Sequence, residues 1–241
     1  MSLKKLFSKN VITYKLYLYY NLFIKNKAHK KREFYGQWGE DIFIQKYFKD
    51  LGKGFYVDIG CFHPVMYSNT YLLFNKGWAG LNIDLNQTSI DLYNILRPKD
   101  INICAAISSK EEEKELFFDH NFSPVNTLSK TFFDYSLGNA FLELKNEKIS
   151  IKKIKTQTFE KIVSKLKSIP KINFLNVDCE GYDFQVLESF NLDFYKPELI
   201  CVETHDIKNE KTEDYKKITE LLDNFNYKFV KRCGPSSFYS K

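Results

Sequence analysis

The chain has 241 residues, of which 44% are hydrophobic, and this predicts a globular domain with a full core and excludes a disordered chain. The formal net charge of +6 is unevenly spread. Residues 1–32 hold nine basic residues and no acidic one, which leaves 27 basic and 30 acidic residues for the rest. Because the body of the chain has no excess of positive charge, we expect no nucleic-acid partner.

The first 32 residues are predicted to form a separate segment with a helix over residues 11–24. This stretch is too short to span a bilayer and is interrupted by Lys15 and Asn21, and no signal-peptide cleavage site follows it. A helix that is apolar almost all round is usually buried, so we expect it to pack on the main domain or on a second subunit. Its basic, aromatic composition leaves contact with an anionic membrane surface as the alternative.

From residue 33 onward, helical and strand-like patterns alternate. Hydrophobic periodicity predicts helices over residues 36–51, 67–75, 88–96, 158–167, 184–190 and 212–225. It predicts strands over residues 55–59, 80–83, 101–107, 115–118, 149–155, 172–177, 199–202 and 227–231. Residues 119–148 show no clear pattern. This alternation favours an α/β fold with a mostly parallel sheet and helices on both faces.

The five cysteines show no spacing typical of a zinc site or of a disulfide framework. We interpret them as reduced thiols of a cytoplasmic protein. The protein is therefore expected in the cytoplasm, either free or held at the inner membrane surface through residues 1–32.

Acidic residues close four of the predicted strands: Asp58, Asp84, Asp178 and Glu203. In open α/β sheets, ligands bind beyond the carboxyl ends of the strands, so these side chains are expected to share one crevice. Each acid taken alone could be only a helix cap or a turn residue.

The spacing of the first two acids indicates a nucleoside cofactor. An acid at the end of the second strand can accept hydrogen bonds from both ribose hydroxyls, and Gly60 lets the backbone approach the ligand. A dinucleotide site needs further glycines that cradle phosphates, whereas Gly60 is followed by Cys61, Phe62, His63 and Pro64. S-adenosylmethionine has a ribose and no phosphate, and it fits this pattern better.

Five ordered motifs make the resemblance specific: QWGED at 37–41, FYVDIGCFHP at 55–64, SNTY at 68–71, KGWAGLNID at 76–84 and FLNVDCEG at 174–181. Together they resemble the FkbM family of methyltransferases over residues 34–239, and the resemblance implies that residues 33–241 form the methyltransferase domain. The resemblance implies a Rossmann-like class I methyltransferase fold, with a seven-stranded sheet whose last strand is antiparallel. It also implies O-methylation of a sugar, a glycan or another small molecule.

By position, the resemblance also implies the site. Asp84 would hold the ribose, residues 103–108 would border the adenine, and Asp178 would end the strand that faces the methyl group. The expected cofactor-binding residues are Asp58, Gly60, Cys61, Phe62, His63, Asn69, Asp84, Ala105 and Asp178. The expected catalytic residues are Asp178, Glu180, Glu203 and His205.

Several alternatives stay open at this point. Any of the four catalytic candidates could remove the proton from the acceptor hydroxyl, and Asp178, Glu180, Glu203 and His205 are also suitable ligands for a divalent metal, although no spacing demands one. Residues 123–127 are either a substrate loop or a solvent loop. A nicotinamide-dependent oxidoreductase and a non-catalytic binding module are the other function classes.

Overall fold

The structure, a computed structural model, describes residues 10–26, 32–118, 123, 126–138 and 150–241. Its centre is a seven-stranded sheet in the order β3-β2-β1-β7-β8-β10-β9. The strands are β1 (Phe55–Ile59), β2 (Ala79–Asp84), β3 (Ile101–Cys104), β7 (Phe174–Val177), β8 (Leu199–Glu203), β9 (Lys228–Cys233) and β10 (Ser236–Ser240). The neighbouring strands β3, β2, β1, β7 and β8 pair in parallel. Strand β10 pairs antiparallel with both β8 and β9. The predicted α/β class and mostly parallel seven-stranded sheet are confirmed.

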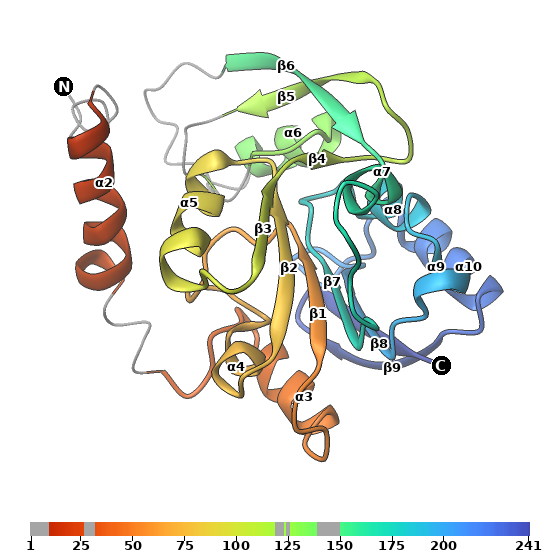
Figure 1. The fold of residues 1–241 in the computed structure, drawn as a ribbon. Helices are drawn as coiled ribbons and strands as arrows, with labels where there is room; N and C mark the ends of the chain where they lie inside the picture. Colours follow the sequence, from red (N-terminus) through yellow and green to blue (C-terminus); the bar gives the residue numbers. More distant parts are fainter. Residues whose placement is uncertain (1–9, 27–31, 119–122, 124–125, 139–149) are drawn as a thin grey trace.

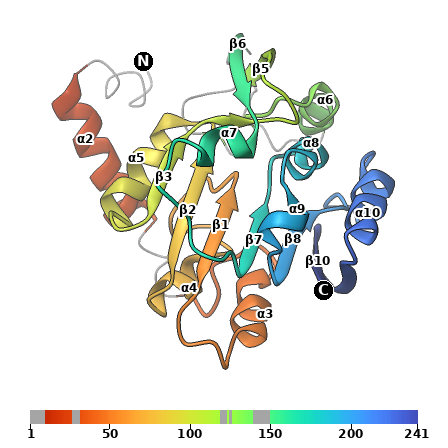
Figure 2. The same cartoon turned by 45° about the vertical axis from the view of Figure 1, so that its right-hand side comes forward.

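Helices cover both faces of this sheet (Figures 1 and 2). One face carries α3 (Glu40–Tyr47), α4 (Tyr71–Asn75) and α5 (Gln87–Leu96). The other face carries α7 (Phe159–Val163), α8 (Asp183–Glu188), α9 (Leu192–Tyr195) and α10 (Tyr215–Asn224).

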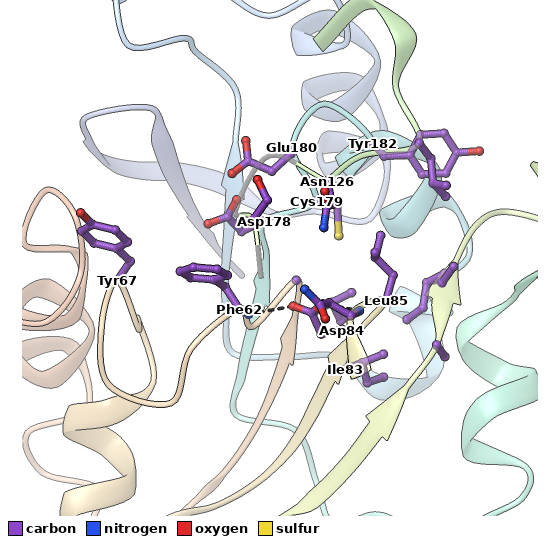
Figure 3. Close-up of a pocket in the computed structure, with 18 of the residues that line it drawn as sticks. Phe62, Tyr67, Ile83, Asp84, Leu85, Asn126, Asp178, Cys179, Glu180 and Tyr182 are labelled. Atoms are coloured by element: carbon purple, nitrogen blue, oxygen red, sulfur yellow. Dashed lines mark hydrogen bonds between the residues drawn. The ribbon is translucent and has the colours of Figure 1, made fainter. Parts of the chain in front are cut away.

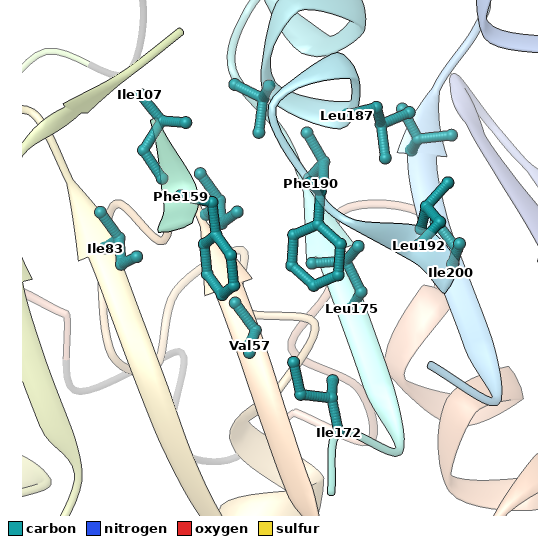
Figure 4. Close-up of a cluster of buried hydrophobic side chains, with 14 of the residues drawn as sticks. Val57, Ile83, Ile107, Phe159, Ile172, Leu175, Leu187, Phe190, Leu192 and Ile200 are labelled. Carbon is teal, nitrogen blue, oxygen red and sulfur yellow. The ribbon is translucent and has the colours of Figure 1, made fainter. Parts of the chain in front are cut away.

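Side chains of each strand alternate between the two faces. In β1, Val57 belongs to the same apolar cluster as Phe159 of α7 and Leu187 of α8 (Figure 4), whereas Tyr56 belongs to a second cluster with Ile44 of α3. Because both faces are buried, the central strands are apolar almost throughout, which is why the sequence predicted them well.

A smaller sheet lies over the carboxyl ends of the central strands (Figure 1). It consists of β4 (Ala106–Ile107), β5 (Glu113–Phe118) and β6 (Ser150–Gln157) in the order β4-β6-β5, with α6 (Lys130–Gly138) beside it. The single strand predicted over residues 101–107 is therefore wrong. After Ala105 the chain leaves the main sheet, and Ala106 pairs with Thr156 of β6 instead.

The C-terminal hairpin was only half predicted. The strand expected over residues 227–231 corresponds to β9, but β10 follows it through a turn at Gly234, where φ is +54°. The predicted helix over residues 36–51 is shorter in the structure. Gly39 has φ of +78° and precedes the first helical residue, Glu40.

The N-terminal segment contributes α2 (Val11–Tyr20) and a π-helical turn, η1 (Asn21–Lys25). Leu18 and Leu22 pack on Leu92 of α5, and the Tyr14 hydroxyl donates a hydrogen bond to Asp91 at 2.7 Å. The described part of this segment thus packs on the main domain, while residues 1–9 and 27–31 of the predicted segment lie outside the described residues. Among the described helices, none has the length and hydropathy needed to cross a membrane.

Candidate active site

A pocket opens at the carboxyl ends of β1, β2 and β7, as predicted for an α/β sheet (Figure 3). Six of the residues expected at the site line it: Gly60, Phe62, Asp84, Ala105, Asp178 and Glu180. The small sheet contributes the wall formed by Ala106 and Ile107.

Asp84 ends β2 with its carboxyl group almost fully buried at the pocket. One oxygen accepts a hydrogen bond from the backbone N–H of Phe62 at 2.8 Å, and the other accepts one from Asn86 at 2.7 Å. Burial raises the pKa of Asp84 to about 6, while these two hydrogen bonds oppose the rise. Each carboxylate oxygen has a second lone pair, so the group can still accept hydrogen bonds from two ligand hydroxyls.

The wall beside Asp84 is mainly apolar and comes from Leu85, Ala105, Ile107 and Tyr182. Asn86, which also lines the pocket, caps α5 through its Oδ1. The helix predicted over residues 88–96 therefore begins one residue earlier, at Gln87. The Nδ2 of Asn86 is buried and has no hydrogen-bond partner in the described part of the chain. This wall can therefore hold a flat ring and offer it one hydrogen-bond donor.

The loop after β1 approaches β7 closely at Gly60. Its φ is +80°, and a Cβ built there would lie 1.8 Å from the carbonyl oxygen of Asp178, so only glycine fits. The N–H groups of Gly60 and Cys61 both point to the carbonyl oxygen of Ile83, at 2.9 and 3.4 Å. With the Phe62 N–H bound to Asp84, three consecutive backbone donors of this loop are already used.

Four expected cofactor residues are not among those lining the pocket: Asp58, Cys61, His63 and Asn69. Asp58 faces the other side of β1, where it accepts hydrogen bonds from Thr70 at 2.7 Å and Asn176 at 2.9 Å. Asn69 in turn donates to Asn176 at 3.0 Å. The expectation of direct contact overlooked the alternation of side chains along a strand, which turns Asp58 away from the face of Ile59.

His63 is fully buried and holds the loop from inside. Its Nδ1 accepts hydrogen bonds from the N–H groups of Val65 and Met66, so the ring proton is on Nε2, which faces Asn21 Oδ1 at 3.1 Å. Asn26 lies 3.4 Å from the same nitrogen. The N-terminal segment therefore directly contacts the loop after β1. Cys61 is buried with Ile90 and Tyr93 of α5.

Arg97, which was not predicted from the sequence, connects the C-terminal end of α5 to the segment that follows β1. Its fully buried guanidinium donates to the Pro64 carbonyl at 2.6 Å and to Ser68 and Thr70 at 3.0 and 2.9 Å. It also reaches the hydroxyl of Tyr56 at 3.0 Å. A lone arginine before Pro98 reads as a solvated helix end, so the sequence offered no signal.

Three carboxylates gather at the ends of β7 and β8. Asp178, Glu180 and Glu203 each place an oxygen within 4.8 Å of the other two. Burial raises the pKa of all three well above the ordinary values, and the neighbouring carboxylates raise them further. The cluster therefore holds a proton more readily than ordinary carboxylates do, and its oxygens would also suit a divalent cation.

A strained turn positions Glu180 in this cluster. Glu180 and Gly181 have φ of +53° and +81°, and the carboxylate of Asp183 accepts hydrogen bonds from the N–H groups of Cys179 and Gly181. The Thr127 hydroxyl donates to the Glu180 carbonyl at 2.7 Å. Figure 3 shows the carboxyl groups of Asp178 and Glu180 directed toward the side of Phe62 and Tyr67.

His205 lies apart from this pocket. It lines a separate shallow hollow together with Tyr215 and Arg232, and its Nδ1 is 2.9 Å from the hydroxyl of Thr204. Burial, with help from Arg232 and Lys211, lowers the pKa of His205. The structure therefore does not bring His205 to the pocket, and its role as a base stays a prediction.

The pocket also contains residues that the sequence analysis did not select. Gln37 and Tyr67 line it, and so do Ser123 and Asn126. Ser123 and Asn126 belong to residues 123–127, for which the sequence left two interpretations, a substrate loop or a solvent loop. Both residues line the pocket. Pro124 and Val125 lie outside the described residues.

Residues 56–229 match the family model described as the methyltransferase FkbM domain. The chain belongs to the FkbM methyltransferase family. Searches of curated proteins and of solved structures found no match to the chain. The matched FkbM domain begins within β1 and ends within β9, so it contains Asp84 and all three clustered carboxylates, whereas α2 precedes it. The predicted family is thus confirmed, and the protein is a methyltransferase.

Proposed function

We propose that the protein transfers a methyl group from S-adenosylmethionine to a hydroxyl of a sugar, a glycan or a related small molecule. The observation that carries the proposal is the position of Asp84. It lies at the end of β2, between an apolar wall and the carboxylate cluster of Asp178, Glu180 and Glu203.

The residues beside Asp84 suit the nucleoside part of this cofactor. The carboxylate would accept hydrogen bonds from both ribose hydroxyls, and Leu85, Ala105 and Ile107 would contact the adenine ring. The buried Nδ2 of Asn86 would gain a partner in a ring nitrogen or a ribose oxygen, which removes the cost of leaving it unpaired.

The loop after β1 argues against a dinucleotide. A pyrophosphate needs free backbone N–H groups, and those of Gly60, Cys61 and Phe62 already donate to Ile83 and Asp84. A nicotinamide-dependent reaction is therefore a poor fit to this loop, in agreement with the family match.

When bound, the cofactor supplies an activated methyl group on a sulfonium. The chain must align the acceptor oxygen with that group and remove its proton. Alignment can lower a barrier by about 7–11 kcal/mol in well-oriented systems. The raised pKa values of Glu180 and Glu203 make them stronger bases than ordinary carboxylates, and we assign proton removal to one of these two.

Aromatic side chains support a sugar as the acceptor. Phe62 and Tyr67 line the side of the pocket toward which Asp178 and Glu180 point (Figure 3). An aromatic ring can cover the apolar face of a sugar, while carboxylates accept hydrogen bonds from its hydroxyls.

The proposal is tested by incubating the protein with methyl-labelled S-adenosylmethionine and a panel of free sugars, nucleotide sugars and glycans. We expect label in an alkali-stable methyl ether on a hydroxyl-bearing acceptor. Label that reaches only amines, carboxylates or carbon centres in a matched panel would contradict the proposed acceptor class.

A further inference from the structure

The N-terminal helix has an apolar face on each side, and within the described part of the chain one of them is buried against α5 while the other is exposed. Leu18 and Leu22 face α5, where they are buried against Leu92. The opposite side of α2 and η1 is exposed and consists mainly of large apolar residues. We call this side the outward face: Val11, Ile12, Leu16, Tyr19, Tyr20, Phe23 and Ile24, with Lys15 among them.

The outward face is one continuous stripe. Its members recur in pairs at intervals of about four residues, so they stand above one another along the helix. Val11, Ile12 and Ile24 are 71%, 68% and 65% exposed, and the other apolar members are between 43% and 59% exposed. Figures 1 and 2 show α2 on the outer side of α5, at the edge of the molecule. A contiguous apolar surface of this kind marks an interaction site.

The charge of the segment selects the partner. Residues 1–32 contain nine basic residues and no acidic one, and Lys15 and Lys25 are exposed on the described helix. A second copy docked face to face would bring together two basic segments, neither of which contains an acidic residue. An anionic lipid surface complements the charge and also accepts the apolar and tyrosine side chains at the depth of its headgroups.

We propose that the outward face of α2 and η1 docks the protein on an anionic membrane surface, with the helix lying in the plane of the interface. The inner face of the same helix stays packed on α5, and Asn21 and Asn26 stay in contact with His63. The methyltransferase domain is thereby held rigidly at the lipid surface through the helix that supports its cofactor loop.

The test is co-sedimentation of the full chain with vesicles of phosphatidylcholine alone and of phosphatidylcholine with about 30% phosphatidylglycerol. We expect binding to the anionic vesicles at least tenfold tighter than to the neutral ones, weakening as salt is raised. The double variant Leu16→Ser/Ile24→Ser should lose at least tenfold of this binding. The control double variant Ile151→Ser/Phe194→Ser removes two comparably exposed apolar side chains from the main domain and should bind like the wild type.

Charge and oligomeric state complete the test. Lys15→Gln/Lys25→Gln should weaken binding to anionic vesicles several-fold, whereas Lys49→Gln/Lys167→Gln should not. All four substituted sites are exposed, and unchanged thermal melting checks that each variant folds. Equal binding by Leu16→Ser/Ile24→Ser and the wild type overturns the proposal. So does a lipid-free dimer in analytical ultracentrifugation that this variant dissociates, since the outward face would then be covered by a second copy.

Discussion

Asp84 closes β2 at the pocket, so its removal tests the ribose assignment, and because it also anchors two loop N–H groups the fold of the variant must be checked separately. We predict that Asp84→Ala weakens S-adenosylmethionine binding about 10- to 150-fold for each ribose hydrogen bond that is lost, because each hydrogen bond to a charged group contributes about 1.5–3 kcal/mol. Isothermal titration calorimetry measures the affinity, and circular dichroism confirms the fold. Asp50→Ala, at an exposed turn, is the control and should leave the affinity unchanged. Wild-type affinity in a folded Asp84→Ala protein would contradict the ribose assignment.

Because the pKa of Asp84 is raised to about 6, cofactor affinity and protein stability should change with pH in opposite directions. Ribose hydroxyls donate to the carboxylate, so cofactor affinity should rise between pH 5 and pH 7 and level off above. The folded state holds this proton more tightly than the unfolded chain does. The residue's contribution to stability is therefore full below about pH 4 and is lost as the pH rises through 6. Calorimetric titrations at several pH values check the first sign. The part of the rise in cofactor affinity that ionisation of Asp84 causes must be absent in the Asp84→Ala variant.

Glu180 and Glu203 differ in what they touch, although they share one cluster. Glu180 lines the pocket, whereas Glu203 joins the cluster from the end of β8. Changing the residue that removes the acceptor proton to Gln should lower kcat about 10²- to 10⁴-fold, while the affinity for the cofactor changes little. Initial rates with the acceptor found by screening measure this. If Glu180→Gln, Glu203→Gln and His205→Ala all keep full turnover, catalysis relies on alignment alone.

Helix α5 and the segment between β1 and α4 depend on one another through Arg97. We predict that Arg97→Met lowers the free energy of unfolding by about 3–5 kcal/mol, because it leaves the Pro64 carbonyl and the Asp58 network without their buried cation. Urea unfolding measures this change. Lys99→Met, at an exposed position two residues later, should change stability by no more than about 0.5 kcal/mol. A change below 1 kcal/mol for Arg97→Met would show that the network is dispensable.

The elements that were predictable from sequence are those whose hydrophobic pattern has a single physical cause, which for the central strands is burial on both faces. Strands β1, β2, β7 and β8 are buried on both faces, and their apolar runs and terminal acids identified both the sheet and the pocket edge. β10 was missed because Ser236 and Ser237 interrupt its apolar pattern, although both are buried against neighbouring strands.

The site was less predictable than the sheet, because side-chain direction and long-range contacts decide it. Asp84 and Asp178 follow from their positions at strand ends. Asp58 does not reach the pocket, since alternation turns it toward Thr70 and Asn176. Tyr67 reaches the pocket from a residue with φ of +58°, a conformation that no local pattern announces.

The whole molecule joins an acidic catalytic domain to a basic helical segment. The two are not independent, because η1 contacts His63 in the loop after β1 while α2 packs on α5. The family match covers the domain that holds the pocket, and the geometry of that pocket supports a nucleoside cofactor without phosphates.

Calorimetric titration of the full chain with S-adenosylmethionine, S-adenosylhomocysteine and NAD tests this account most directly. We expect saturable one-site binding of the first two and no binding of NAD, since Asp84 is placed to accept hydrogen bonds from a ribose whereas the loop donors are already used. Binding of NAD with no binding of S-adenosylmethionine or S-adenosylhomocysteine would contradict it.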